Sequence, residues 1–409
     1  MDLPDSVSTL PCNLCAGRDV TVVSRRSRSG EPLRTVACKG CGLVWSDPRP
    51  QEARRFYTED YRLAYKGTFA PKDKHVLRAG RVALDRLEMI RSHLRGRMKV
   101  LDVGSGGGEF AYLLQSLGHE VTGVEPNRGY AGFAAAQYGL DIRRGMLDEV
   151  DLEPGHWDLV TVWHVLEHME DPAAVLRKLR AALRPGGRLV VEVPNVEAVC
   201  QSPRSTFHEA HIFSFGIPTL GRLGEKAGFR VERTAASPDG GNILVVFQAA
   251  DEPAPADDAI PGHHERVVRT LRRHTPWRHA FTRHPWTRLV SRLGRAVEEP
   301  FALRPGLKGR ALLDALYARP APVAPRGAAW WPWLVGAYAL AVVAEESIVD
   351  GHERLALIGP DNALPVYLML QVLVIGALLQ RLRNKRASTR ELIKLGGWSV
   401  PLLAVPLVC

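Results

Sequence analysis

The sequence predicts an α/β chain, in which a doubly wound sheet of seven strands follows a cysteine-rich module and precedes an apolar helical segment. Three observations lead to this fold class. Short apolar runs alternate with helical patterns over residues 76–250, two close pairs of cysteines precede residue 70, and two uncharged runs lie near the C-terminus. The predicted segments are residues 1–70, 76–250, 251–328 and 329–409.

The composition is that of a globular chain long enough for two or more domains: 409 residues, 45% hydrophobic and 24% charged. Its formal net charge of +10 comes from residues 259–328, which hold 14 Lys and Arg against 4 Asp and Glu. The N-terminus shows no basic stretch followed by an apolar one, so we expect no secretion signal. Paired cysteines in an unsecreted chain favour a metal site over disulfides.

Residues 76–250 alternate between helical and extended patterns. The first helix is marked by leucines at helical spacing, which are Leu77, Leu84, Leu87 and Leu94. The predicted strands are residues 99–103, 120–125, 141–145, 157–163, 187–194, 229–235 and 242–249. The predicted helices between them are residues 109–118, 130–139, 172–183 and 218–228. The last two strands have a short connection, which suits an antiparallel pair.

A glycine-rich turn follows the first of these strands. A dinucleotide-binding fingerprint that starts at Gly104 would need glycine at position 109, where the chain has Glu109. The pattern present is D-x-G-x-G-x-G, with Asp102, Gly104, Gly106 and Gly108. Such a turn lets backbone approach a ligand closely and opens a helix whose N–H groups can act as donors.

This turn, the glutamate that ends the next strand and the turn "LRPGG" resemble the class I S-adenosylmethionine-dependent methyltransferases, whose fold is Rossmann-like. The resemblance covers about residues 76–250. It implies that the turn, with Gly104, Ser105, Gly106 and Gly108, lies under the methionine part of the cofactor. Asp102 would orient the amino group, Glu125 would accept hydrogen bonds from the ribose hydroxyls, and Asp148 would lie near the adenine amino group.

The four N-terminal cysteines are spaced as two metal-binding knuckles, with Cys12 and Cys15 in one and Cys38 and Cys41 in the other. Two C-x-x-C pairs are typical of a structural zinc ribbon with four thiolate ligands. Because thiolates fill all four positions, we expect no metal chemistry there. A ribbon followed by "CGLVWSDPRP" resembles the N-terminal module of methyltransferases that modify sugars and other small cell-surface precursors.

Three histidines are candidates for a general base, which a hydroxyl acceptor needs: His168, His211 and His164. His164 and His168 follow the fourth strand and His211 follows the fifth, so all three are expected at the carboxyl edge of the sheet. "HVLEH" also fits the H-x-x-E-H pattern of certain zinc peptidases. A strand pattern before it and Asp171-Pro172 after it leave one helical turn at most, which argues against a peptidase site.

The C-terminal region contains two uncharged runs, residues 327–344 and 363–380, that just reach the length of a membrane span. A third run, residues 395–409, is shorter and contains two prolines. Basic residues flank both spans on the outside and acidic residues lie between them, which places the α/β segment on the cytoplasmic side. For the basic, aromatic-containing residues 262–328 we favour contact with anionic lipid over nucleic acid or a merely solvated surface.

Taken together, these patterns predict a methyltransferase that uses S-adenosylmethionine, holds structural Zn²⁺, and acts on a small-molecule or lipid- or glycan-precursor acceptor at the cytoplasmic membrane face. Two alternatives stay open. One is a zinc-ribbon methyltransferase that acts on RNA; the other is a non-catalytic, membrane-associated scaffold with this fold. The sequence indicates neither the acceptor nor the oligomeric state.

Overall fold

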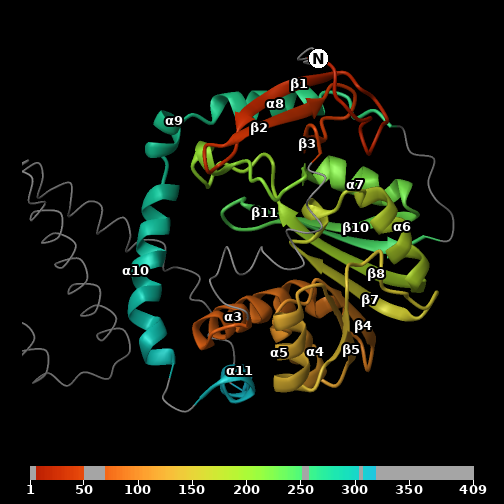
Figure 1. The fold of residues 1–409 in the computed structure, drawn as a ribbon, viewed down its shortest axis with the longest axis vertical. Coiled ribbons are helices and arrows are strands. Elements are labelled where there is room, and N and C mark those ends of the chain that lie inside the picture. Colours follow the sequence, from red (N-terminus) through yellow and green to blue (C-terminus); the bar gives the residue numbers. More distant parts are fainter. Residues whose placement is uncertain (1–5, 50–69, 251–257, 304–306, 319–409) are drawn as a thin grey trace, which may run out of the picture. The chain divides into compact units, whose positions relative to one another are not determined.

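The computed structural model describes residues 6–49, 70–250, 258–303 and 307–318 (Figure 1). The predicted membrane spans at 327–344 and 363–380 and the third apolar run lie outside these ranges. Among the described residues, no helix combines the length and the apolar character that a membrane span requires.

A seven-stranded mixed sheet forms the centre of the structure, with strand order β10-β11-β8-β7-β4-β5-β6. Five neighbouring strands, β8, β7, β4, β5 and β6, run parallel to one another. Strand β11 lies antiparallel to both β8 and β10. The strands are β4 (Lys99–Val103), β5 (Glu120–Glu125), β6 (Asp141–Arg144), β7 (Trp157–Trp163), β8 (Leu183–Pro194), β10 (Phe229–Ala236) and β11 (Asn242–Ala249).

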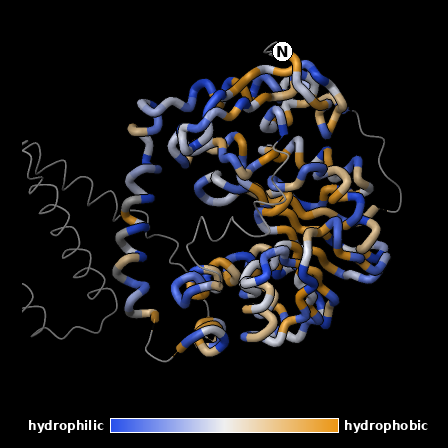
Figure 2. The backbone as a smooth tube through the Cα atoms, viewed as in Figure 1, coloured by the Kyte–Doolittle hydropathy of each residue, from blue (hydrophilic) through white to orange (hydrophobic). Residues whose placement is uncertain are grey.

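Helices cover both faces of this sheet (Figure 1). On one face lie α3 (Asp73–Ile90), α4 (Glu109–Ser116), α5 (Arg128–Tyr138) and α11 (Gly309–Tyr317), and on the other lie α6 (Pro172–Ala182) and α7 (Ile217–Lys226). Because side chains alternate along a strand, Val100 of β4 packs towards α3 and α4 whereas Leu101 packs towards α6 and α7. Figure 2 shows the hydrophobic residues concentrated in these central strands.

The four-cysteine module folds as a second, smaller sheet with the order β1-β2-β3-β9. Its first three strands are β1 (Val20–Arg26), β2 (Pro32–Cys38) and β3 (Val44–Ser46). The fourth, β9 (Phe213–Ser214), comes from the α/β segment and pairs antiparallel with β3. The core packed between the central sheet and α6 and α7 is continuous with Leu14, Val36 and Trp45 of the module.

Three further helices follow the α/β segment: α8 (His263–Arg273), α9 (Pro276–Ala280) and α10 (His284–Ala302). The first packs on the small sheet, where Val267 and Val268 join Ala37 and Val44 in a separate apolar cluster. The third is tied to α3 by an ion pair between Arg78 and Glu299 at 2.5 Å.

The predicted seven strands and the antiparallel final pair are confirmed, and the helices are found within a few residues of their predicted bounds. Two features differ from the prediction. Strand β8 begins at Leu183 instead of 187, because Trp157 of β7 already pairs with Leu183. Strand β9 was not predicted, because two residues are too few to show a period.

A close helix–strand contact gives a stability test. A Cβ atom on Gly224 of α7 would lie 2.2 Å from Cε1 of the buried Phe247 ring. We expect Gly224→Ala to lower the free energy of unfolding by about 1–3 kcal/mol, the usual cost of overpacking a core. Urea denaturation of both proteins measures this difference.

The matched control is Gly132→Ala on α5, where an added Cβ meets no atom within 4 Å. Because alanine favours helix over glycine by about 1 kcal/mol, this variant should be as stable as the parent or more so. Equal effects of the two substitutions would contradict the packing argument.

Candidate functional site

A cavity of about 490 Å³ opens at the carboxyl ends of the parallel strands β4, β5 and β7. Its walls come from the glycine turn after β4, the end of β5, the loop after β6 and the segment after β7. Open parallel sheets bind ligands at this edge, where neighbouring connections leave the sheet in opposite directions. The cavity therefore lies where the sequence places the candidate cofactor and acceptor residues.

The glycine turn is shaped by three residues with positive φ, Gly104 at +71°, Gly106 at +59° and Gly108 at +85°. A Cβ on Gly104 would lie 2.3 Å from Cγ2 of Val165, so a larger residue would collide with the segment after β7. Gly104, Ser105 and Gly106 line the cavity, and Gly108 precedes α4 as its N-cap residue. The turn therefore forms one wall of the cavity, and a side chain at position 104 would not fit there.

Glu125 ends β5 at the cavity wall and is 3% exposed. One carboxylate oxygen accepts a hydrogen bond from the backbone N–H of Gly106 at 2.8 Å, and the other accepts one from Asn127 at 3.1 Å. These bonds fix the carboxylate between the glycine turn and the start of α5. Carboxylate oxygens are also suitable acceptors for hydroxyl donors such as those of a ribose.

Asp102 and Asp148 lie away from the main cavity wall. Asp102 is buried behind the glycine turn, where it accepts a hydrogen bond from Thr161 Oγ1 at 2.7 Å, and burial raises its pKa to about 6. Asp148 is exposed and lines an adjacent cavity of about 310 Å³. The two cavities share Met146, Leu147, His168 and Met169.

The segment after β7 carries two of the candidate histidines and a buried carboxylate. It forms a single 3₁₀ turn, Leu166–His168, which agrees with the expected absence of a sustained helix. His164 adopts a positive φ of +55°, and its ring lies between two carboxylates, 3.4 Å from Glu167 and 3.1 Å from Glu192. Burial lowers the pKa of His164, but the two carboxylates outweigh burial and raise the pKa to about 9.

Glu167 is 1% exposed, and within the described residues its oxygens accept no hydrogen bond that satisfies distance and angle. Burial alone would raise its pKa. The surrounding imidazoles of His168 and His164 outweigh burial and bring the pKa to about 2, so the carboxylate is ionised at neutral pH. Glu167 therefore supplies a fixed negative charge at the floor of the cavity.

His168 and His211 meet at the cavity wall with their ring centres 4.8 Å apart. The Nδ1 of His168 lies 2.8 Å from the carbonyl oxygen of Ala210, which fixes the ring if Nδ1 carries the proton. His208 stacks on His211 at 5.0 Å. Burial and the nearby His168 lower the pKa of His211 to about 3, so this ring is neutral at physiological pH.

Arg86, which lines the cavity, and its partner Glu192, which is outside the lining, are charged residues that were not predicted. Arg86 of α3 lines the cavity, lies over the Trp163 ring at 4.7 Å and is 3.7 Å from Glu192 of β8. Both gave a signal in the sequence, because Arg86 stands next to Leu87 on an apolar helix face and Glu192 interrupts the apolar strand "RLVVEVP". Charged residues in such places are rarely buried unless paired.

The four cysteines form one cluster in the small sheet. Their Sγ atoms all lie within 4.8 Å of one another, with Cys12 and Cys41 separated by 3.5 Å and Cys15 and Cys38 by 3.3 Å. A tetrahedral zinc with bonds of about 2.3 Å would hold sulfurs roughly 3.8 Å apart, so the donor set fits such an ion. Glu167, His168 and His211 form a second group whose donor atoms could hold a cation.

The pKa of His164 gives a pH test. Since this pKa is raised from an ordinary value of about 6.5 to about 9, protonated His164 stabilises the folded state fully below about pH 6.5 and loses that effect as pH rises through 9. We expect the difference in unfolding free energy between the parent and His164→Asn to be larger at pH 6 than at pH 10.

Asparagine is chosen because, after glycine, it is the uncharged residue that best tolerates positive φ. Denaturation at the two pH values measures the difference. A difference that stays constant between pH 6 and pH 10 would contradict a charged His164.

Comparison with known proteins gives one family match: a model described as "Methyltransferase domain" matches residues 75–234. Ubiquinone biosynthesis O-methyltransferases are similar, at 32% identity over 103 residues in Aeromonas salmonicida and 36% over 115 residues in Marinobacter nauticus. These alignments cover 24% and 26% of this chain, and 43% and 47% of the relatives. The chain thus spans about half the length of the curated relatives it matches.

Solved structures with a similar fold include an S-adenosylmethionine-dependent methyltransferase from Mesorhizobium loti, with 18% identity and a TM-score of 0.36 over 39% of this chain and 96% of that one. Another is a Burkholderia thailandensis 1,6-didemethyltoxoflavin-N1-methyltransferase, with 20% identity and a TM-score of 0.38 over 51% and 96%. Residues 75–234 of this chain, which hold the glycine turn and most of the seven-stranded sheet, are thus similar to the methyltransferase domain family.

Proposed function

We propose that the whole protein transfers a methyl group from S-adenosylmethionine to a small-molecule or lipid- or glycan-precursor acceptor. One observation carries this proposal: the glycine turn, Glu125 and the histidine pair of His168 and His211 line the same cavity. The cofactor residues and the candidate acceptor residues are thereby close enough to serve one reaction.

The residues present fit the cofactor. The turn from Gly104 to Gly106 would lie along its methionine part, where any side chain on Gly104 is excluded by Val165. Glu125 would accept both ribose hydroxyls, since backbone N–H groups already hold its two oxygens in place. Met146 and Leu147 would flank the adenine, with Asp148 in the adjoining cavity as the partner of its amino group.

S-adenosylmethionine supplies a methyl group already activated on a sulfonium, so the protein mainly positions the acceptor and receives its proton. His211 is suited to receive a proton because its ring is neutral, with a pKa near 3. Its weak basicity means that the proton moves only as the acceptor oxygen becomes more acidic by gaining the methyl group. His168 lies against the same ring and orients it.

The role of His164 differs, because its raised pKa keeps the ring protonated at neutral pH. A protonated imidazole cannot act as the base. Together with Glu167, Glu192 and Arg86 it forms a row of alternating charges along the floor of the cavity. We assign this row to positioning and the proton transfer to His211, with His168 orienting the His211 ring.

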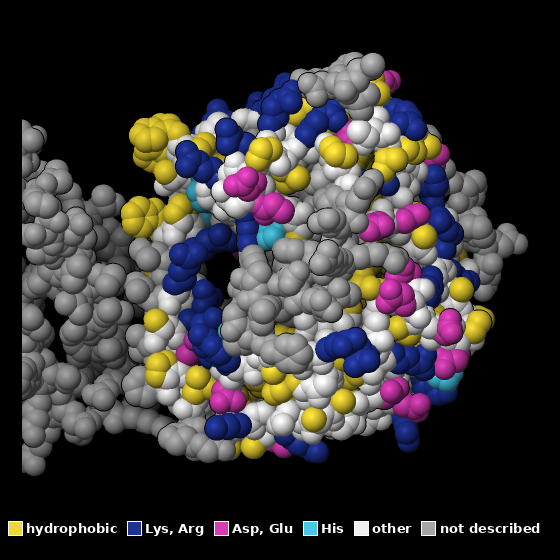
Figure 3. All heavy atoms as spheres, in the orientation of Figure 1, with side chains coloured by type: hydrophobic (Ala, Val, Ile, Leu, Met, Phe, Trp, Pro, Cys, Tyr) yellow, Lys and Arg dark blue, Asp and Glu magenta, His cyan; other side chains and the backbone are white. Residues whose placement is uncertain are grey.

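The proposal includes action at the cytoplasmic face of a membrane. The uncharged runs outside the described residues support this location, and so does the surface of α9 and α10. Residues 269–295 contain eight arginines and no acidic residue. Within this stretch Trp277 is 75% exposed, Phe281 77% and Trp286 66%, and Figure 3 shows hydrophobic and basic side chains together at that edge.

Cofactor binding tests the catalytic proposal. Glu125→Ala should weaken S-adenosylhomocysteine binding by about 10- to 100-fold, since hydrogen bonds to a charged group contribute about 1.5–3 kcal/mol. Titration calorimetry measures the affinity, and transfer of a labelled methyl group into cell-envelope extract measures activity. We expect the affinity for S-adenosylhomocysteine and the methyl transfer activity to fall together in Glu125→Ala.

The control is Glu120→Ala, which removes the exposed carboxylate at the opposite end of the same strand. It should leave the affinity within about twofold of the parent, because a surface side chain away from the site has little effect. A parent protein that binds no S-adenosylhomocysteine would favour the non-catalytic scaffold.

Vesicle binding tests the location. Replacing Arg278, Arg283 and Arg292 with glutamine in the full chain should weaken binding to vesicles that contain phosphatidylglycerol by roughly 100-fold, at about 1 kcal/mol for each arginine. Binding to pure phosphatidylcholine vesicles should change little. Co-sedimentation at low and high salt measures both.

The matched control replaces Arg95, Arg97 and Arg144, which are exposed elsewhere on the α/β domain. If this control loses as much vesicle binding, the loss reflects the net charge of the protein and not a specific surface on α9 and α10. Tighter, salt-dependent binding to RNA than to the vesicles would support the RNA alternative instead.

A further inference from the structure

We propose that the four-cysteine module is part of the active site, because it holds the loop that places His211 at the cavity. This inference rests on the proposed function. It assigns to Ser46, and to the turn that holds Cys38 and Cys41, the role of positioning His211. The loop in question is residues 207–214, which carries His208 and His211 and ends in strand β9.

The first contact is the pairing of β9 with β3 of the module. Trp45 pairs with Phe213, and the backbone N–H of Ser46 donates to the carbonyl of Ile212 at 2.9 Å. The Ser46 hydroxyl also donates to the carbonyl oxygen of His211 at 3.2 Å. Trp45, Ser46, Ile212 and Phe213 are at most 2% exposed, so water cannot easily replace the bonds that they make.

The second contact comes from the hairpin turn between β1 and β2. The backbone N–H of Arg28 donates to the carbonyl of Phe207 at 2.8 Å, and the Ser29 hydroxyl donates to the carboxylate of Glu209. The module therefore holds the loop at both of its ends, at residue 207 and at residues 211–214.

The methyltransferase domain holds the same loop between these two points. His168 contacts the carbonyl of Ala210 at 2.8 Å, and the N–H of Ala210 donates to the His208 ring at 2.8 Å. The loop is thus fixed between His168 on one side and the module on the other. Without the module, the loop would lose the bonds made at residues 207, 211 and 212.

Two of the cysteines flank the turn that leads into β3, the strand that pairs with β9. Cys38 is the last residue of β2, and Cys41 lies three residues before β3 begins. The turn between them is closed by hydrogen bonds from Cys38 N–H to Leu43 and from Gly42 N–H to Cys38, each 2.9 Å. A metal bound by both cysteines would fix this turn, since small modules of this kind gain folding energy from their metal.

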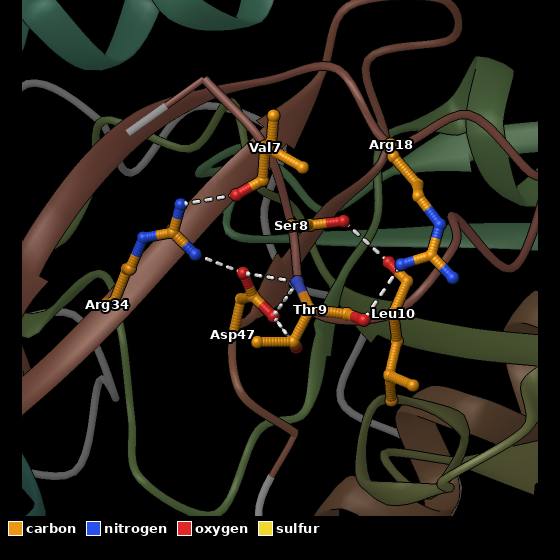
Figure 4. Close-up of polar contacts among 7 residues, drawn as sticks. All are labelled: Val7, Ser8, Thr9, Leu10, Arg18, Arg34 and Asp47. Atoms are coloured by element: carbon orange, nitrogen blue, oxygen red, sulfur yellow. Dashed lines mark hydrogen bonds and ion pairs between the residues drawn. The ribbon is translucent and has the colours of Figure 1, made fainter. Parts of the chain in front are cut away.

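The other end of β3 is fixed by Asp47, which is 1% exposed. Figure 4 shows its carboxylate accepting the backbone N–H of Thr9, at 3.1 Å, and pairing with Arg34. This contact ties the segment before Cys12 to the end of β3. Both ends of β3 therefore depend on the cysteine module, and His211 depends on β3.

The experiment removes the metal from the full chain by chelation, with metal analysis before and after, and follows three quantities. Hydrogen exchange of residues 208–214 should accelerate by at least about tenfold, which corresponds to a loss of 1.4 kcal/mol of local stability. Carbethoxylation of His211, mapped by mass spectrometry, should become faster. S-adenosylhomocysteine affinity should stay within about twofold, because the glycine turn belongs to the other sheet.

A second variant keeps the test decisive if metal loss unfolds the whole chain. Ser46→Ala removes the hydroxyl bond to His211 and leaves all four cysteines in place. It should raise the carbethoxylation rate of His211, and Ser46→Thr should restore it. The control is Ser24→Ala in β1, whose hydroxyl bonds to Arg26 away from the loop.

Two results would overturn the inference. One is unchanged exchange of residues 208–214 after verified metal loss in a protein that still binds S-adenosylhomocysteine. The other is equal His211 reactivity in Ser46→Ala and Ser24→Ala. Failure of the proposed function would look different, because the intact protein would then bind no S-adenosylhomocysteine while the coupling between metal and loop could still be measured.

Discussion

The parallel alignment of β4, β5, β7 and β8 is the constraint on which the whole site depends. Because these strands run in one direction, their carboxyl ends reach the same edge of the sheet, and the four connecting segments meet there. The glycine turn, Glu125 and the histidine-bearing segment come from different parts of the chain, yet each follows the end of one of these strands. Without this alignment the cavity would have no walls.

The site also depends on how buried charges are balanced. Glu167, His164, Glu192 and Arg86 alternate in sign across three secondary-structure elements, with neighbouring groups 3.1 to 3.7 Å apart. Removing one member would leave its neighbour as an uncompensated buried charge, which costs more than the pair itself contributes. This arrangement explains how Glu167 can be ionised although it is only 1% exposed.

Local patterns were sufficient to predict most of the fold and the cofactor side of the site. The glycine turn, Glu125 and each C-x-x-C pair are encoded within a few consecutive residues, and short apolar runs mark the central strands of the large sheet, such as β4, β7 and β11. The acceptor side was harder to predict, because it is built from long-range contacts. The raised pKa of His164 depends on Glu192, which lies on the neighbouring strand β8, and β9 finds its partner β3 more than 160 residues away.

Strand β9 also changes where the domains of this chain begin and end. The composition places a boundary near residue 70, but one apolar core includes Leu14, Val36 and Trp45 together with Phe213, Leu220 and Phe247. A core shared in this way joins the two sequence segments, since each buries part of its apolar surface against the other. The structural unit that contains the large sheet therefore also includes the N-terminal strands and does not begin at residue 75.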